Sequence, residues 1–394
     1  MYIGINIIKS HAMSCLNRDE DGMPKTCVFG AEKRARISTQ NQKYTIRHAD
    51  VFADLAAEIG VGTRTRHLSN LVSEEIGNRA FEEGKFNALI HAMDASYAKL
   101  DEEKTIRNFT AFEVKMLADK IENWSKDKSA EEIEVTVAKL LAASESKKSG
   151  SKKKNEELPE DVEAMLKAFS TDGVYGTMGS LDIALFGRMV TSGSNEGRST
   201  EAAVCMSHAM STHATAIQND FFTAVDEVID DCGAAHMNNT AYDSACYYQF
   251  MAIDTNQLME NLAFIDDPEK RKEIAVKAVK ALLMCAAGMS SASRQHAFAS
   301  MPFPAAIMVE MRENTANFSY ANAYEKPVKA DVDGGYIEPS VIALRDLAEK
   351  TEKMFECFAP EKRLWLTTQD GVKFDSTCTI NCASFGEMLD NIKF

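Results

Sequence analysis

The sequence lacks the short motifs by which many enzymes and metal sites are recognised. It has no P-loop, no GxGxxG after a predicted strand and no HExxH, and its nine cysteines form no CxxC pair. The nearest two, Cys378 and Cys382, have no histidine nearby to complete a zinc site. We expect reduced thiols in the core, no metal and no cofactor. No nucleophile, base and orienting group come together, so we expect a protein that is not an enzyme.

Long apolar runs are also missing. No stretch approaches the ~18 apolar residues of a membrane span. The first residues, MYIGINIIKSHAMSCLN, show no secretory leader pattern. We therefore expect a soluble, cytoplasmic protein without a membrane partner. Its 394 residues, 45% of them hydrophobic, are enough for two or three compact units.

Acids are absent from one stretch of an otherwise acidic chain. The formal net charge is −15, yet residues 33–49 contain five lysines or arginines and no acid. At physiological salt, charges more than ~8 Å apart are largely screened from one another, so local density outweighs the total. Such donors bind phosphate oxygens without reading bases, and the alternative is a solvated basic face without a ligand. The five cations are Lys33, Arg34, Arg36, Lys43 and Arg47.

Hydrophobic periodicity predicts the elements around this stretch. Residues 2–8 alternate as a half-buried strand, and a second extended stretch leads to Ile37. Ser38 or Thr39 can then cap a helix with its hydroxyl. One stripe of that helix is expected to face the core, namely Tyr44, Phe52, Leu55, Ala56 and Ile59. A different stripe carries Gln40, Lys43 and Arg47.

The rest of the chain alternates between helical and extended patterns. Residues 60–170 look mostly helical, except that 143–161 has almost no apolar content and predicts a solvated, lysine-rich linker. Strands are predicted at 180–190, 244–254 and 305–312, a helix at 267–288, and irregular sequence at 191–242. Without the insertions, the order β-α-β-β-α-β is the ferredoxin-like order of RNA-recognition sheets, an α+β fold.

Four separated motifs resemble a known family. They are SCLNRDEDGMPKTCVFGAEKRARISTQNQKYTIR (14–47), LDIALFGRMVTSG (181–193), FFTAVDEV (221–228) with GAAHM (233–237), and ANAYEKPVKA (321–330). In this order they resemble the crRNA-binding backbone subunits, called CasC, of type I-E CRISPR Cascade complexes, in the RAMP superfamily. Glu32 departs from the more basic pattern of these proteins, and the lysine-rich segment looks like an addition.

The resemblance implies a hand-shaped protein with a ferredoxin-like palm, a helical finger domain and a thumb. The implied segments are 1–58, 179–190 and 243–394 for the palm, 59–178 for the finger with 143–161 as a flexible loop, and 191–242 for the thumb. Several copies would line up head to tail on the crRNA, kink it at regular intervals and present it to a target DNA strand. The implied partners also include the large, small and crRNA-end-binding Cascade subunits.

The predicted RNA-binding residues come from the basic stretch and from the matching motifs. The turn and helix would hold the RNA backbone, while an apolar side chain and the thumb would lie beside a displaced base. The residues are Arg18, Lys25, Arg36, Ser38, Gln40, Lys43, Arg47, Met189, Phe222, Thr223 and Met237.

Two other functions remain open. Related backbone subunits in other CRISPR systems cut their target from an acidic loop residue, so an endoribonuclease using Asp182 or His11 is the first alternative. A cytosolic metabolic oligomer with a basic substrate pocket is the second.

Overall fold

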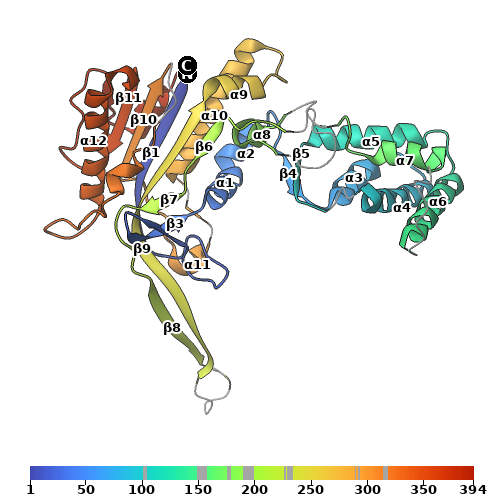
Figure 1. The fold of residues 1–394 in the computed structure, drawn as a ribbon, viewed down its shortest axis with the longest axis horizontal. Coiled ribbons are helices and arrows are strands. Elements are labelled where there is room, and N and C mark those ends of the chain that lie inside the picture. The colour runs from blue at the N-terminus through green and yellow to red at the C-terminus, as the bar shows by residue number, and fades with distance from the viewer. Residues whose placement is uncertain are drawn as a thin grey trace. The chain divides into compact units, whose positions relative to one another are not determined.

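The computed structural model divides the chain into two compact units (Figure 1). The first comprises Met1–Leu55 with Ala202–Phe394, and the second comprises Ala56–Glu201. Because the second unit lies within the sequence of the first, the first is assembled from two distant segments. The structure describes residues 1–100, 104–148, 158–174, 179–189, 199–225, 228, 234–288, 290–291, 293–313 and 318–394.

The first unit is built on a mixed sheet. Its order is β12-β11-β10-β1-β9-β7-β3-β2, with β6 and β8 also paired to β9. The pairs are antiparallel, apart from the parallel pair of β11 and β12. The strands are β1 Tyr2–Ser14, β2 Thr26–Phe29, β3 Glu32–Ile37, β6 Val204–Met206, β7 Ala209–Ser211, β8 Gln218–Val225, β9 Ala234–Asp254, β10 Ala306–Arg312, β11 Lys362–Thr367 and β12 Thr379–Asn381.

Helices cover both faces of this sheet. Ile8 of β1 belongs to a core that includes Val341 and Leu344 of one helix, α12. The next residue, Lys9, points to the opposite face, where its Nζ donates to Ala286 O of α10 at 3.2 Å. The helices are α1 Thr39–Arg47, α2 Asp50–Ala56, α9 Thr255–Asn261, α10 Pro268–Gly288, α11 Gln295–Phe298, α12 Ile337–Met354 and α13 Phe385–Asp390, with 3₁₀ turns η1 Ala321–Tyr324 and η2 Glu356–Phe358.

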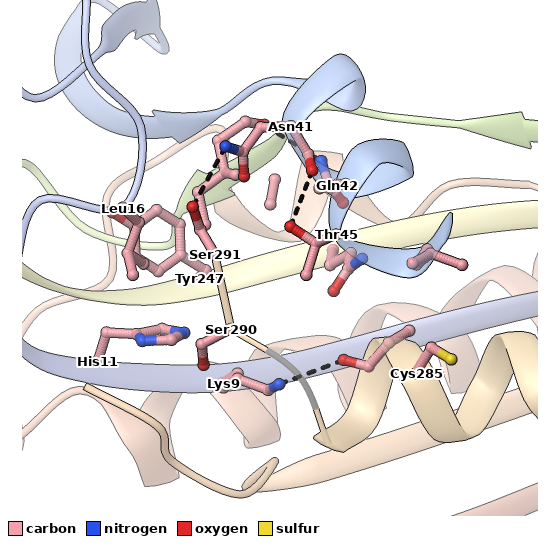
Figure 2. Close-up of a pocket in the computed structure, with 15 residues that line it drawn as sticks. Lys9, His11, Leu16, Asn41, Gln42, Thr45, Tyr247, Cys285, Ser290 and Ser291 are labelled. Carbon is pink, nitrogen blue, oxygen red and sulfur yellow. Dashed lines mark hydrogen bonds between the residues drawn. The ribbon is translucent and has the colours of Figure 1, made fainter. Parts of the chain in front are cut away.

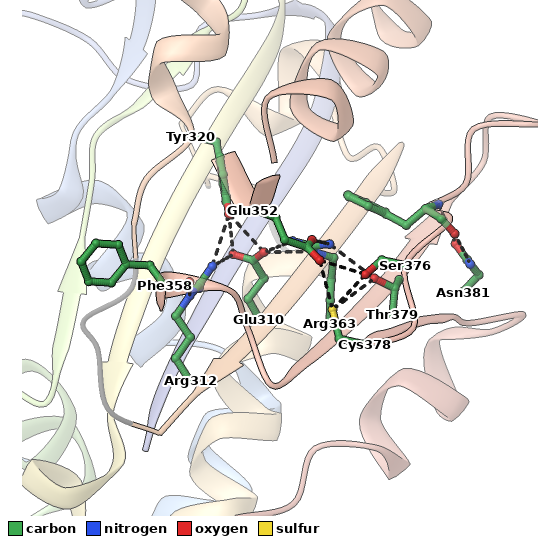
Figure 3. A network of polar contacts seen from close by, with 11 residues as sticks. Glu310, Arg312, Tyr320, Glu352, Phe358, Arg363, Ser376, Cys378, Thr379 and Asn381 are labelled. Atoms are coloured by element: carbon green, nitrogen blue, oxygen red, sulfur yellow. Dashed lines mark hydrogen bonds and ion pairs between the residues drawn. The ribbon is translucent and has the colours of Figure 1, made fainter. Parts of the chain in front are cut away.

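A buried charge network joins β10 to β11 (Figure 3). Glu310 Oε1 accepts from Arg363 Nε at 2.9 Å and Nη2 at 2.8 Å, and its Oε2 accepts from Arg312 Nη2 at 2.9 Å. The Tyr320 hydroxyl donates to the same carboxylate, and Glu352 accepts from Arg363 Nη1 at 2.8 Å. Two arginines thus face two glutamates, so the buried charges are compensated.

The second unit is mainly helical. One core joins its helices through residues such as Leu89, Leu117, Val137 and Met165. A short antiparallel pair joins β4, which precedes α3, to β5, which lies between α4 and α5. The elements are β4 Thr63–Thr65, α3 Leu68–Gly77, α4 Glu83–Leu100, β5 Arg107–Phe109, α5 Ala111–Ser125, α6 Ala130–Lys148, α7 Glu160–Phe169 and α8 Leu181–Phe186.

Most of the predicted elements are confirmed. The strands at 2–8, 244–254 and 305–312 correspond to β1, β9 and β10, and the helix at 267–288 corresponds to α10. However, β1 is buried on both faces from Ile3 to Lys9 rather than half-buried, because helices cover each side of the sheet.

Three predictions about local structure are wrong. Residues 191–242 are not irregular throughout, because they contain β6, β7, β8 and the start of β9. Residues 180–190 do not form a strand, since Leu181–Phe186 is helix α8. A short buried apolar run cannot distinguish the two by periodicity. Within 143–161, α6 continues to Lys148 and α7 begins at Glu160, while 149–157 lie outside the described residues.

The predicted helix of the basic stretch is also interrupted. Ser38 caps α1 as predicted, but α1 ends at Arg47 and α2 begins at Asp50. Tyr44 is therefore 57% exposed and stacks on His48 instead of facing the core, with ring centroids 4.0 Å apart. Ile46 is buried in its place.

The remaining sequence predictions concern thiols and membranes. Eight cysteines fall within the described residues and all are free. Cys205 and Cys357 are exposed, so the expectation of buried thiols is wrong for these two. No described helix is long and apolar enough to cross a membrane.

Candidate nucleic-acid interface

Backbone hydrogen bonds gather the predicted cations of the first unit. Lys25 N donates to Asn17 O at 2.7 Å, and Lys25 O accepts from Arg36 N at 2.9 Å. The side chain of Asn17 accepts from Ser38 N at 2.9 Å. Arg18, which is exposed, follows Asn17 directly. Four of the predicted residues, from the loop before β2, from β3 and from the turn before α1, are thus tied together.

The N-terminus of α1 is held next to these cations. Ser38 Oγ accepts from Asn41 N at 3.3 Å, and the first turn of α1 carries no acid. The side chain of Gln42 donates to Ile37 O and Ser207 O, both at 3.1 Å. Because the hydroxyl of Ser38 is engaged as the cap and the residue is buried, its role is to position α1. The free N–H groups of the helix give this end a partial positive charge.

The cations beside α1 influence a neighbouring histidine. Partial burial, together with the charges of Arg36 and Lys25, lowers the pKa of His208. Arg36 Nε is buried and has no hydrogen-bond partner within the described part of the chain. On α1 itself Gln40 is exposed, while Lys43 is partly buried. Arg47, also partly buried, is one turn beyond Lys43 on the same stripe.

Arg34 does not belong to this surface, which corrects one prediction. The residue is fully buried, and its guanidinium donates to Ser211 O at 3.0 Å, Tyr324 O at 2.8 Å and Glu325 O at 3.3 Å. The cation is therefore a connector between β3, β7 and η1. A phosphate outside the molecule cannot reach it.

A small pocket lies beneath α1 (Figure 2). Its volume is about 60 Å³, and Lys9, His11 and Tyr247 line it. Burial lowers the pKa of Lys9 to about 8. Burial and the charge of Lys9 lower the pKa of His11 to about 4, and its Nδ1 lies 3.1 Å from Ser300 Oγ. A neutral, enclosed His11 in a pocket of this size has no room for a nucleotide.

Asp182, the other candidate catalytic residue, is also enclosed. It is 2% exposed. Its Oδ1 accepts from Gly62 N and Ser180 Oγ, both at 2.8 Å, and its Oδ2 accepts from Asn108 Nδ2 at 2.9 Å. The carboxylate therefore fixes the start of α8 against β5. Among the described residues, no cluster of three or more histidines, cysteines or acids is arranged to hold a metal ion.

The predicted thumb residues lie on a projecting hairpin of the first unit (Figure 1). Every residue of β8 is exposed. Thr223 pairs with Met237, and Phe222 pairs with Asn238, so Thr223 and Met237 share one face and Phe222 lies on the other. Phe221 is on the face of Met237, and the two are 64% and 62% exposed. The sequence analysis missed Phe221. Neighbouring residues of a strand point to opposite faces, so the pair of Phe221 and Phe222 could have indicated an apolar side chain on each face of the hairpin.

Exposed apolar side chains on this hairpin require a partner to cover them. A two-stranded ribbon has no core of its own. Phe222 is 42% exposed and approaches only His236 among the described rings, at 6.1 Å between centroids. Contiguous exposed apolar surface of this kind marks an interaction site. Parts of the predicted thumb, 191–198, 226–227 and 229–233, lie outside the described residues.

Met189 belongs to the second unit and is 82% exposed. It follows Arg188, whose Nη1 lies 2.9 Å from Glu113 Oε2 and donates to Asn108 O at 3.1 Å. The backbone of Arg188 also pairs with Thr200. Buried anchors thus hold an exposed methionine in place.

Comparisons with known proteins show which solved structures this fold is similar to. The structure is similar to a chain of a solved "CRISPR RNA-guided surveillance complex, pre-nicking", with 22% sequence identity, a TM-score of 0.74, and coverage of 99% of this chain and 98% of that one. A chain of a second "CRISPR RNA-guided surveillance complex" matches with 18% identity, a TM-score of 0.57, and coverage of 99% and 97%. No curated protein matches.

A family model identifies the class to which the chain belongs. The model described as "CT1975-like protein" matches residues 3–391. Nearly the whole chain is covered. The chain is therefore a member of the CT1975-like protein family.

Proposed function

We propose that this protein is the crRNA-binding backbone subunit of a type I-E CRISPR Cascade complex. In this proposal it binds the spacer part of the guide, kinks it at regular intervals and presents it for pairing with target DNA. The family membership and the likeness to chains of RNA-guided surveillance complexes support a component of such a complex. The residues of the interface support the specific role.

The sheet supports a ferredoxin-like palm. Four strands lie in the order β10-β1-β9-β6, with antiparallel pairing throughout. In the chain, α1 lies between β1 and β6, and α10 lies between β9 and β10. This is the β-α-β-β-α-β order of RNA-recognition sheets, with β6 as the second strand in place of residues 180–190.

The single observation that carries the proposal is the fixed pairing of Lys25 and Arg36 beside the acid-free start of α1. Their backbones are hydrogen-bonded to each other, so their charges stay together. Arg36 is only partly buried, so its guanidinium can donate to a phosphate oxygen. Arg18, Gln40 and the stripe of Lys43 and Arg47 extend the same surface along the guide.

The thumb would hold a displaced base, and Met189 would contact the guide as an apolar wedge. Phe222 can stack on a base, whereas Met237 and Thr223 contact the strand from the other face of the hairpin. Stacking contributes ~1–3 kcal/mol per base and tolerates any sequence. Repetition by copies placed head to tail would give an open helical assembly, whose other members would be the large, small and crRNA-end-binding subunits.

A scaffold without catalysis fits the two candidate catalytic residues better than a nuclease does. Asp182 accepts three hydrogen bonds in a buried site, and His11 is enclosed with a lowered pKa. Neither the carboxylate of Asp182 nor the imidazole of His11 is exposed to a nucleic-acid strand. Regularly spaced cuts in guide-complementary RNA, made by the purified assembly with divalent metal, would contradict this assignment.

The salt dependence of RNA binding tests the proposed grip. Each phosphate contact contributes ~−0.7 to the slope of log affinity against log salt on a single strand. Changing Lys25 and Arg36 to alanine should therefore flatten the slope by about 1.4. Fluorescence anisotropy with a labelled guide RNA measures it.

A matched pair of substitutions controls for the loss of net charge. Lys350 and Lys353 are exposed on α12, which covers the other face of the sheet from α10. Changing both to alanine should leave the slope unaltered. Equal slopes for the wild type and the Lys25 and Arg36 variant would refute the proposed grip.

A further inference from the structure

The second unit presents a group of cations that the sequence analysis did not single out. Arg64, Arg66 and Lys104 are exposed. They come from two stretches without acids, 59–73 and 104–112. The strands β4 and β5 bring these stretches together, because Arg64 pairs with Asn108 and Thr65 pairs with Arg107.

The register determines which side chains share a face of this strand pair. Residues directly opposite each other in an antiparallel pair lie on the same face. Arg64 therefore shares a face with Asn108, and continuing the register places Arg66 beside Ile106. Phe109 is on the opposite face, where it joins the helical core. On the face with the two arginines, Arg64, Arg66 and Ile106 are exposed, whereas Asn108 is buried.

The same face adjoins the segment that presents Met189. Asn108 Nδ2 donates to Asp182 at the start of α8, and Asn108 O accepts from Arg188 just beyond the end of α8. Gly187, with a φ of +73°, makes the turn between α8 and Arg188. One polar cluster therefore fixes β5, α8 and the exposed Met189.

The charge and polarity of this face are those of a nucleic-acid contact. The two acids of the cluster are buried and already bonded, Glu113 to Arg188 and Asp182 to three donors. The two arginines add exposed positive charge to this face. Next to it stand two strongly exposed apolar side chains, Ile106 at 71% and Met189 at 82%.

Exposed apolar groups beside cations favour a single strand over a duplex. A duplex offers mainly phosphates to a protein surface, whereas an unpaired strand offers base faces as well. We propose that Arg64, Arg66, Ile106 and Met189 form a second RNA-binding surface, on the second unit. It holds a single-stranded stretch of the guide, with phosphates on the arginines and a base against the apolar pair. This inference depends on the proposed function.

Guide binding by the full-length chain tests the second surface separately from the first. Changing Arg64 and Arg66 to alanine should flatten the salt slope by about 1.4. Changing Met189 to alanine should weaken binding several-fold at every salt concentration without altering the slope, because no charge is lost. Thermal melting shows whether each variant is folded.

The matched control removes two exposed lysines of the same unit. Lys126 lies beyond the far end of α5, about 24 Å along the helix axis from Thr110, and Lys167 lies on α7. Changing both to alanine should leave the slope unchanged. A DNA strand of the same sequence, measured in parallel, shows whether the surface serves RNA.

The outcomes distinguish this inference from the proposed function. A slope that changes for the Lys25 and Arg36 variant but not for the Arg64 and Arg66 variant overturns the second surface alone. If the slope changes for neither variant, both the second surface and the proposed function are overturned. Loss confined to the DNA strand also overturns the inference, because the surface would then not hold the guide.

Discussion

Replacing Glu113 with alanine should destabilise the second unit, because it removes the carboxylate that faces the buried guanidinium of Arg188. The two side chains are 0% and 4% exposed, and Glu113 Oε2 lies 2.9 Å from Arg188 Nη1. The same carboxylate accepts from Thr110 N at 2.9 Å and completes the capping box of α5. One substitution therefore removes an ion-pair partner and half of a helix cap.

The expected magnitude follows from these two contributions. Breaking a buried ion pair by removing one partner costs about 3–5 kcal/mol. Loss of a cap adds about 1 kcal/mol. We expect the free energy of unfolding of the second unit to fall by about 4–6 kcal/mol, which is most of the stability of a typical domain.

The two tryptophans make the assay specific to one unit. Trp124 lies in the second unit and Trp365 in the first. In a Trp365→Phe background, urea unfolding followed by tryptophan fluorescence reports the second unit alone. Trp365→Phe without the Glu113 substitution is the reference.

A double substitution distinguishes the buried charge from lost packing. Glu113→Gln keeps the size of the side chain but removes the negative charge that faces Arg188. Adding Arg188→Met removes the positive charge as well and should recover more than half of the lost stability. A loss below about 1 kcal/mol for Glu113→Ala, typical of a surface pair, would refute the reasoning. So would the absence of any recovery in the double variant.

Two further predictions concern the first unit. Arg34→Met should lower the free energy of unfolding by about 2–4 kcal/mol, because buried carbonyls of Ser211 and Tyr324 lose their donor. It should leave the salt slope of guide binding unchanged, and a flattened slope would return Arg34 to the interface. Burial raises the pKa of Asp243 from 3.8 to about 6. The folded chain then holds more protons than the unfolded chain between these values, so stability falls as pH rises through this window. Asp243→Asn should remove that fall and stabilise the protein above pH 6 by up to about 3 kcal/mol in urea unfolding, whereas an unaltered pH profile would contradict the assignment.

The sequence correctly predicted the elements that have a clear hydrophobic period and a clear capping signal. The run of Ile3, Ile5 and Ile7 indicated a strand, and Ser38 indicated the start of a helix; both are present. Neither signal depends on distant residues, since alternation and capping are local. The family motifs added positions such as Met189, whose exposure a reading based on spacing would have missed.

The remaining errors arise where distant contacts decide the outcome. Arg34 looked like one of five equivalent cations, but carbonyls almost 180 and 290 residues away bury it. Residues 181–186 read as a strand, while hydrogen bonds from Gly62 and Asn108 to Asp182 fix them as the start of a helix. The face with Arg64 escaped notice because its members come from separate stretches that only the pairing of β4 with β5 joins.

The pairing of β1 has a consequence for synthesis of the chain. Tyr2 pairs with Asp254 on one side and Arg312 on the other. The first strand therefore leaves the ribosome long before either of its neighbouring strands, β9 and β10, has been synthesised. Residues 56–201 are complete before those two strands are made. Nascent chains should acquire protease resistance first in that internal segment, and the apolar β1 is a natural client for a chaperone until the last third of the protein emerges.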